Sequence, residues 1–151
     1  MNILGVHIGH DSGAALIRNG TIVSDVSEER FRRIKHFAGF PSFSIEYCLR
    51  VAGICSQDID IIAIPTVGVR EELNHFFELE GPQREVADDS TVGAQAVENV
   101  TIKRPPSYVK RFPVARRTEI HHVGHHLAHA ASAYYTCGSN VPQLVVTMDG
   151  V

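Results

Sequence analysis

The sequence predicts an α/β fold built on a mixed sheet, with its elements in the order β-β-β-α-β-α. Three observations predict it. The first 26 residues contain three short β-type runs, a helix and a buried strand follow between residues 41 and 65, and a histidine-rich helix begins near residue 125. With 151 residues, 44% of them hydrophobic, the chain can bury one core. We therefore expect one lobe in which helices cover a sheet.

The opening of the chain predicts an antiparallel meander. Residues 2–8, 14–18 and 21–26 are short, mostly apolar runs, and Asn19-Gly20 between the last two is typical of a two-residue hairpin turn. The first turn, GHDSG, contains two glycines. This meander resembles the start of the ribonuclease-H-like lobes of the actin, sugar-kinase and Hsp70 superfamily, in which the first turn binds phosphate through backbone N–H groups. The resemblance implies a phosphate-binding role for Asp11 and Ser12.

A charged segment follows at residues 27–39. Its cations are Arg30, Arg32, Arg33, Lys35 and His36. Such crowding is typical of a solvated surface. Because the segment follows the end of a strand, it also suits contact with an anionic substrate.

The next elements are a helix and a strand. Pro41 opens the helix, Ser42 or Ser44 is the expected cap, and Gly53 ends it. The expected buried stripe consists of Ile45, Cys48, Leu49 and Ala52. Residues 60–65 (DIIAIP) have the length and composition of a buried strand.

The middle of the chain is less regular. We expect a short helix at residues 70–79 with Leu73, Phe76 and Phe77 facing inward. Residues 80–117 contain few core signals, and their basic end is typical of a solvated segment, so a surface insertion is expected there. Residues 119–123 form a short predicted strand.

The stretch HHVGHHLAHAASAYY, residues 121–135, is rich in histidine and alanine. A helix from about His125 places His125 and His129 one turn apart on one face, where their imidazoles can bind one divalent ion. His122 and His126 have the same spacing, so spacing alone does not choose between the pairs. The alternative is a buried helix whose histidines are only hydrogen-bonded. Residues 138–140 are expected to end the helix.

The last part of the sequence predicts a buried strand at residues 143–148 (QLVVTM), followed by Asp149 and Gly150. We expect residues 1–140 to form a first lobe and residues 141–151 to open a second lobe whose remainder is absent. An uncovered strand pairs readily with another copy, so a homo-oligomer is expected.

Composition excludes several classes of protein. The net charge of -3 does not indicate a nucleic-acid binder. The three cysteines, Cys48, Cys55 and Cys137, lack metal or disulfide spacing and suit a cytoplasmic protein. No apolar run approaches the roughly 20 residues that span a bilayer, so no membrane segment is expected.

Three motifs occur in order: GHDSGAAL, EERFRRIKHFAGFP and HHLAHAASAYY. Together they resemble the carbamoyltransferase family that includes nodulation-factor, cephem and tobramycin O-carbamoyltransferases. The resemblance implies that carbamoyl phosphate and ATP, with Mg²⁺, give a carbamoyl-adenylate. The carbamoyl group then passes to a hydroxyl of a small-molecule acceptor. A fragment lacking the second lobe is expected to be inactive by itself.

The resemblance also implies residue roles. His10 acts on the carbamoyl group as an acid, base or hydrogen-bond donor, although the residues alone indicate only a turn histidine beside Asp11. Lys35 binds the phosphate of carbamoyl phosphate, assisted by Arg30 and Arg33. The metal ligands that the resemblance implies are His125, His129 and Asp149. The metal of the family is often iron, with zinc or manganese as alternatives. Asp149 and Gly150 would contact the nucleotide.

Two other functions are alternatives to an O-carbamoyltransferase. A threonylcarbamoyl-transferring tRNA enzyme shares the general fold, but EERFRRIKH and the HHLAH form of the histidine motif argue against it. A non-catalytic module that binds a metal or nucleotide is the alternative from another class.

Overall fold

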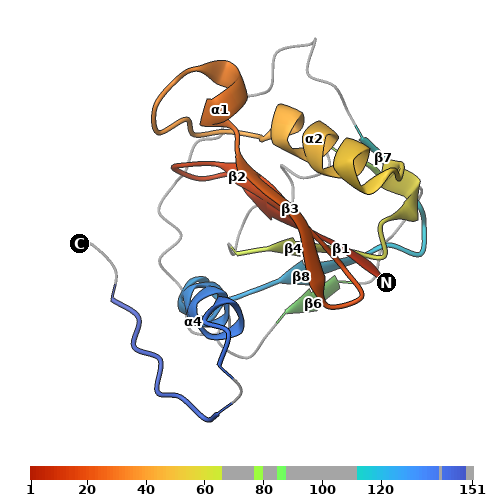
Figure 1. Ribbon diagram of the computed structural model, residues 1–151. Helices are drawn as coiled ribbons and strands as arrows, with labels where there is room; N and C mark the ends of the chain where they lie inside the picture. Colours follow the sequence, from red (N-terminus) through yellow and green to blue (C-terminus); the bar gives the residue numbers. More distant parts are fainter. Residues whose placement is uncertain (66–76, 80–84, 88–111, 140, 149–151) are drawn as a thin grey trace.

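The computed structural model describes residues 1–65, 77–79, 85–87, 112–139 and 141–148. It is an α/β structure whose main sheet is mixed and has the strand order β3-β2-β1-β4-β8-β6 (Figure 1). The α/β class is confirmed. The first elements follow the predicted β-β-β-α-β order, except that a four-residue helix, α1 (Glu29–Arg32), precedes the predicted helix.

The predicted meander is present. Strands β1 (Asn2–His7), β2 (Gly13–Arg18) and β3 (Thr21–Ser27) pair antiparallel in sequence order. Asn19 and Gly20 both have positive φ, 51° and 83°, as a two-residue hairpin turn requires. The local sequence therefore determines the turn and the pairing beside it, Arg18 with Thr21 and Ile17 with Ile22, after which the register shifts at Leu16.

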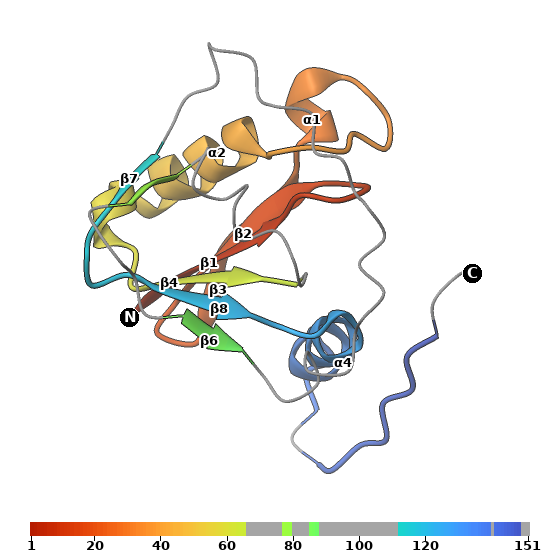
Figure 2. The same ribbon diagram turned by 180° about the vertical axis from the view of Figure 1, so that it is seen from behind.

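The other half of the sheet is parallel. Strand β4 (Ile61–Ile64) pairs with β1, β8 (Glu119–His122) pairs with β4, and β6 (Glu85–Ala87) pairs with β8. The view from behind in Figure 2 shows these strands side by side. Because they are parallel, their carboxyl ends meet at one edge of the sheet.

Helix α2 (Ser42–Ala52) packs on β2 and β3, and Ile45, Cys48 and Leu49 are buried as predicted. Gly53 ends the helix with φ 66°. The predicted serine cap is wrong, because neither Ser42 nor Ser44 caps the helix through its own side chain. The carboxylate of Glu28 instead accepts the backbone N–H groups of the first turn. Glu28 immediately precedes the short helix α1 (Glu29–Arg32).

A second, two-stranded parallel sheet consists of β5 (Phe77–Leu79) and β7 (Phe112–Val114). Phe77 packs edge-on against Phe40, with ring centroids 5.4 Å apart. The predicted helix at 70–79 is wrong for residues 77–79, although Phe77 is buried as expected. Leu73 and Phe76 lie outside the described residues.

The predicted surface insertion at residues 80–117 also needs correction in its described parts. Strand β6 belongs to the main sheet, and Phe112 and Val114 in β7 are buried. These short strands lack the length and alternation that identify strands in a sequence. A one-turn 3₁₀ helix, η1 (Ser56–Asp58), precedes β4, and Ser56 hydrogen-bonds to the carbonyl of Pro113 in β7.

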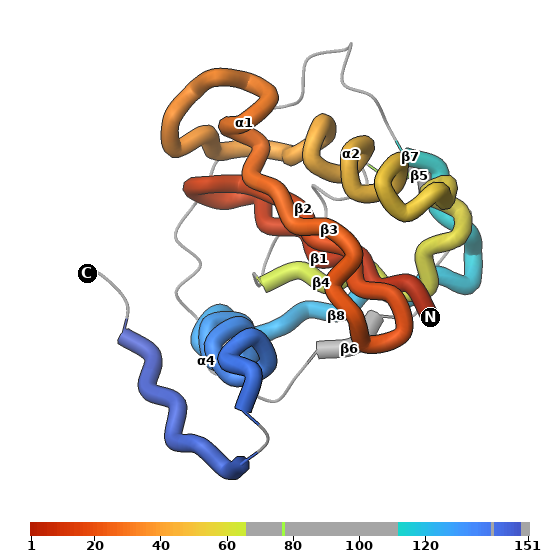
Figure 3. Tube along the Cα trace, viewed as in Figure 1, coloured from red at the N-terminus to blue at the C-terminus, as the bar shows by residue number. Residues whose placement is uncertain are grey.

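Helix α4 (His125–Thr136) begins at the predicted residue and has no buried residue. The tube in Figure 3 shows it beyond the end of β8, followed by an extended stretch. Residues 143–148 in that stretch do not form the predicted buried strand, since Leu144 and Met148 are 91% and 92% exposed. The assignment of a second lobe stays a prediction. Among the described residues, no helix combines the length and apolar character needed to cross a membrane.

Candidate functional site

A cavity of about 360 Å³ lies on the sheet face opposite α2. It exists because the residues on this face of the central strands are small: Gly5 pairs with Ala15 on one side and with Ala63 on the other. Polar side chains also line it: His7, Asp11, Asp25 and Ser27. Ala128 of α4 lines the same cavity, so the cavity reaches from the first turn to the histidine helix.

The first turn carries a compact cluster of three side chains. Nδ1 of His10 lies 2.6 Å from one carboxylate oxygen of Asp11, and Nδ1 of His36 lies 2.8 Å from the other. The two imidazole rings stack with centroids 5.0 Å apart. We call His10, Asp11 and His36 the first-turn cluster. All three side chains are more than half exposed, so a ligand can reach them.

Asp11 is anionic over a wide pH range. The hydrogen bond from His36 lowers the pKa of its carboxyl below the ordinary value, and the charge and hydrogen bond of His10 act in the same direction. His10 uses Nδ1 for this contact. Its Nε2 is then the ring nitrogen oriented for another partner.

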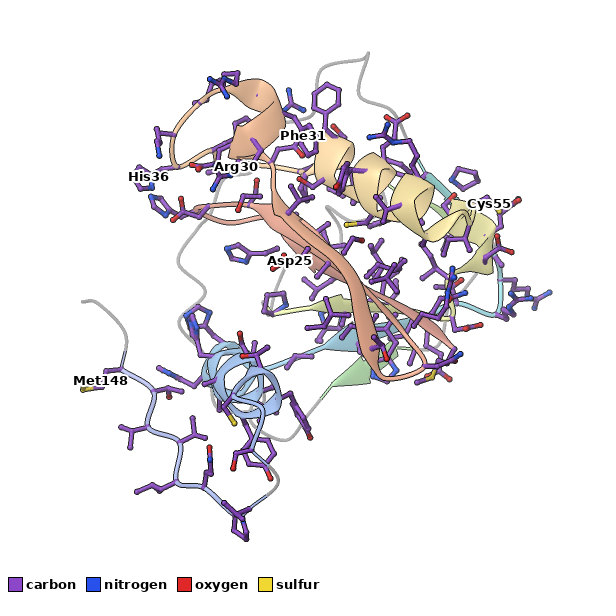
Figure 4. The ribbon with its side chains drawn as sticks, viewed as in Figure 1. Asp25, Arg30, Phe31, His36, Cys55 and Met148 are labelled. Atoms are coloured by element: carbon purple, nitrogen blue, oxygen red, sulfur yellow. The ribbon has the colours of Figure 1, made fainter. Side chains whose placement is uncertain are left out.

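Backbone hydrogen bonds join the first turn to the loop that follows α1. The amide of Ser12 donates to the carbonyl of Phe37 at 2.9 Å, and the amide of Gly39 donates to the carbonyl of Ile8 at 3.1 Å. The amide of Glu28 donates to the carbonyl of Ser12 at 2.9 Å. Two segments far apart in sequence are thereby fixed side by side, which positions His36 against Asp11. Figure 4 shows His36 on the loop that follows α1.

Ser12 is 1% exposed, and its hydroxyl has no hydrogen-bond partner among the described residues. Its role as a ligand of phosphate stays a prediction. The described hydrogen bonds of Ser12 are made by its backbone. In the superfamily that the meander resembles, the first turn also binds phosphate through its backbone.

The cations of the charged segment have different environments. Arg32 is structural: it donates to Glu28 at 2.9 Å and lies over the rings of Phe37 and Phe43. Arg30, Arg33 and Lys35 are exposed. The Nζ of Lys35 lies 3.9 Å from Glu29 and its side chain is 86% exposed, so this ion pair restrains it little.

The histidine helix brings the predicted pair together. The Nε2 atoms of His125 and His129 lie 3.2 Å apart, with the rings nearly perpendicular. Two imidazole nitrogens bound to one metal at about 2.0–2.1 Å are separated by roughly 2.9–3.4 Å for bond angles between octahedral and tetrahedral. The pair therefore fits a shared divalent ion. Asp149, the third predicted ligand, and Gly150 lie outside the described residues.

The competing pair does not share a helical face. His122 ends strand β8, and α4 begins only after Gly124. Nδ1 of His126 instead lies 3.2 Å from the hydroxyl of Thr147. Among the two pairs that the spacing left open, only His125 and His129 are one turn apart on α4.

Sequence reasoning missed two histidines of this region. His36 lies within the motif EERFRRIKHFAGFP, where the neighbouring arginines and lysine indicate only a surface cation. His7 lies in a strand-like run that indicates no further role. It lines the cavity, and its Nε2 lies 2.8 Å from the carbonyl of His10. Successive side chains of a strand point to opposite faces of the sheet, so His7, two residues after Gly5, lies on the cavity face as well.

Comparison with known proteins identifies the class. Residues 2–151 match the family model described as carbamoyltransferase N-terminus, and the chain belongs to this carbamoyltransferase family.

Two individual proteins are similar to this chain. The chain is 33% identical over 148 residues to the nodulation protein NolNO of Sinorhizobium fredii, an alignment that covers 93% of this chain and 19% of the relative. It is 52% identical over 62 residues to an uncharacterised protein of Synechocystis, covering 40% of this chain and 10% of that protein. The chain thus spans at most about a fifth of these two relatives.

Proposed function

We propose that this chain forms the N-terminal part of an ATP-dependent O-carbamoyltransferase. The observation that carries the proposal is the cavity that has Asp11 of the first-turn cluster and Ala128 of the histidine helix in its wall. In a parallel α/β sheet, ligands bind at the carboxyl edge of the strands. The first turn follows the carboxyl end of β1, and α4 follows the carboxyl end of β8.

We assign the lobe to the ribonuclease-H-like fold of the actin, sugar-kinase and Hsp70 superfamily. Support comes from the strand order β3-β2-β1-β4-β8-β6, in which an antiparallel meander lies on one side of β1 and parallel strands lie on the other. In that fold the turn after the first strand contacts phosphate, which matches the position of Asp11 and Ser12 here.

The proposed reaction has three steps: cleavage of carbamoyl phosphate, adenylation of the carbamate, and transfer of the carbamoyl group. Water cleaves carbamoyl phosphate to carbamate and inorganic phosphate. A carbamate oxygen then attacks the α-phosphorus of ATP, which forms carbamoyl-adenylate and releases pyrophosphate. In the transfer step an acceptor hydroxyl oxygen bonds to the carbamoyl carbon, the bond from that carbon to the AMP oxygen breaks, and the hydroxyl proton passes to a base.

His10 is the proposed base or hydrogen-bond donor. Its Nδ1 contacts the Asp11 carboxylate at 2.6 Å, which orients the ring and leaves Nε2 for a proton or a hydrogen bond. The exposed cation Lys35 is proposed to bind the phosphate of carbamoyl phosphate, with Arg30 and Arg33 adding positive charge.

His125 and His129 would hold a divalent metal, iron or alternatively zinc or manganese, with Asp149 as the third ligand. The 3.2 Å separation of their Nε2 atoms supports this assignment. When bound, the ion would supply positive charge for nucleotide phosphate oxygens. ATP with Mg²⁺ is the proposed co-substrate, and Asp149 and Gly150 are proposed to contact it.

Exchange of labelled pyrophosphate into ATP tests the adenylation half of the reaction in the full protein. Exchange is expected only when carbamoyl phosphate is present. His10→Ala should leave this exchange in place and strongly lower carbamoyl transfer to the acceptor, because His10 is proposed to act in the transfer step. His121→Ala is the matched control, because His121 also pairs with a carboxylate, Glu119, at 2.9 Å. Exchange that does not depend on carbamoyl phosphate would exclude the proposed function.

A further inference from the structure

We propose that the first-turn cluster, His10, Asp11 and His36, is a second divalent-cation site. Two imidazole nitrogens and one carboxylate oxygen are the ligand set of a three-residue site with open positions. Their ligand atoms all lie within 4.8 Å of one another. Within the part of the chain that the structure describes, no other group of three or more His, Cys, Asp or Glu side chains has its ligand atoms this close together.

The distances suit an ion between the three groups. Metal–ligand bonds of about 2.0–2.2 Å place two ligands of one ion at most about 4.4 Å apart. At octahedral or tetrahedral angles the separation is about 2.8–3.6 Å. The ligand atoms, which lie within 4.8 Å of one another, reach it by side-chain adjustment, and the 2.6 Å contact between His10 and Asp11 would open slightly. Both histidines present Nδ1 to Asp11, one to each carboxylate oxygen, so the two nitrogens already face the same carboxylate.

The ligands come from two loops that the backbone holds together. Asp11 and His36 have left-handed backbone, with φ of 59° and 53°, and the amide of His36 also donates to Glu29 at 3.2 Å. The hydrogen bonds Ser12 to Phe37 and Gly39 to Ile8 flank the ligand residues on both loops. An ion thus meets a site whose scaffold is already assembled, and only the side chains need to adjust.

The chemistry of the site indicates what it would bind beyond the ion. One carboxylate and two neutral imidazoles carry one negative charge, so a divalent cation leaves a net positive site. The side chains of His10 and His36 are 71% and 67% exposed, which leaves coordination positions open to an anion. Asp11 also lines the cavity, so such an anion would enter from there.

The natural anion is a phosphate oxygen of the acyl phosphate or nucleotide; this identification rests on the proposed function, whereas the cation site itself does not. His10 would keep one of its two proposed roles. With Nδ1 bound to the ion, Nε2 carries the ring proton and can donate a hydrogen bond, but it cannot act as the base. The ion would then hold the ring in place of the Asp11 hydrogen bond.

Zinc binding to the full protein tests the proposal when the other proposed site is removed. A His125→Ala, His129→Ala double variant is titrated with Zn²⁺ against a chromophoric chelator. It is expected to bind one equivalent. Adding His36→Asn should weaken binding by at least about 100-fold, more than the roughly 10–100-fold typical of losing an outer-shell partner.

The matched variant is His36→Asp. Both Asn and Asp tolerate left-handed backbone, but only Asp supplies a good metal ligand, so His36→Asp should retain zinc where His36→Asn does not. Absence of zinc binding in the double variant, or equal binding by the Asn and Asp variants, would overturn the proposal. Pyrophosphate exchange by the unaltered protein reports separately on the proposed function.

Discussion

The carboxylate of Glu28 accepts the backbone amide of Ser44 at 2.8 Å, so a residue before α1 caps the helix α2. Glu28 is fully buried, and it also accepts hydrogen bonds from the Ser44 hydroxyl and from Arg32. One carboxylate therefore joins the charged segment to the first turn of α2. Because its backbone amide bonds to Ser12, the same residue also supports the candidate site.

Replacing Glu28 with Ala is expected to destabilise the protein by on the order of 3 kcal/mol. The change leaves buried amides without an acceptor and leaves the guanidinium of Arg32 without its carboxylate. Urea denaturation followed by circular dichroism measures the loss. Glu46→Ala, which removes an exposed carboxylate from the same helix, should change the free energy of unfolding by no more than about 0.5 kcal/mol. Equal losses would show that Glu28 is not the capping group.

The pKa of the Asp11 carboxyl should depend on His36 more than on His10. The hydrogen bond from His36 is the largest cause of its lowered pKa. His36→Ala is therefore expected to raise the pKa towards the ordinary value by more than His10→Ala does. An NMR titration of the Asp11 carboxyl carbon in metal-free buffer measures both shifts.

The sign of the stability effect follows from the same pKa. A carboxyl whose pKa is lowered by folding stabilises the folded state above its ordinary pKa of about 4. That contribution is lost as the pH falls through the lowered value. A larger shift in the His10 variant than in the His36 variant would contradict the expected order of the two contacts.

Local sequence patterns predicted the elements that local physics determines. Asn19-Gly20 specifies a hairpin turn, and the spacing of Ile45, Cys48 and Leu49 specifies a buried helix face. The spacing of His125 and His129 likewise placed two ring nitrogens together. In each case the residues that decide the structure lie within a few positions of one another.

Contacts between distant segments could not be predicted in this way. The cap of α2 comes from Glu28, 16 positions before Ser44, and His36 meets Asp11 across 25 positions. Both contacts depend on the path of the loop after α1, where Arg33 and His36 adopt left-handed backbone that their residue types do not require. Strand β6 is only three residues long, too short for its alternation to be recognised.

Replacing His125 or His129 with Ala should lower the metal content of the full protein without unfolding α4. Alanine is a better helix former than histidine, so the helix is not weakened by the change itself. Elemental analysis measures the metal, and circular dichroism measures the helix. His126→Ala is the control. The His126 ring packs edge-on against His125, with centroids 5.7 Å apart, but its Nδ1 lies 3.2 Å from the Thr147 hydroxyl and not at the proposed metal position. Loss of metal in the control, with none in the His125 and His129 variants, would show that the metal is bound by other histidines than the proposed pair.

Lys35→Ala should weaken the binding of carbamoyl phosphate more than that of ATP. Loss of one charge-assisted contact to phosphate is worth on the order of 1.5–3 kcal/mol. The apparent constant for carbamoyl phosphate should therefore rise roughly 10- to 150-fold in steady-state kinetics. Lys35→Arg, which keeps the charge, and Arg50→Ala, which removes an exposed cation of α2, are the controls. Equal losses for both substrates would place Lys35 elsewhere in the site.

The chain of residues 1–151, expressed by itself, is expected to self-associate and to be catalytically silent. Leu144, Val146 and Met148 alternate along one extended stretch and are 91%, 72% and 92% exposed, so a second copy can bury them. Size-exclusion chromatography over a range of concentrations measures the association. Val146→Lys should shift the equilibrium to monomer, because burying the new charge is unfavourable. Gln143→Lys adds the same charge beside the apolar stretch and should have a smaller effect. A monomer at all concentrations would contradict this prediction.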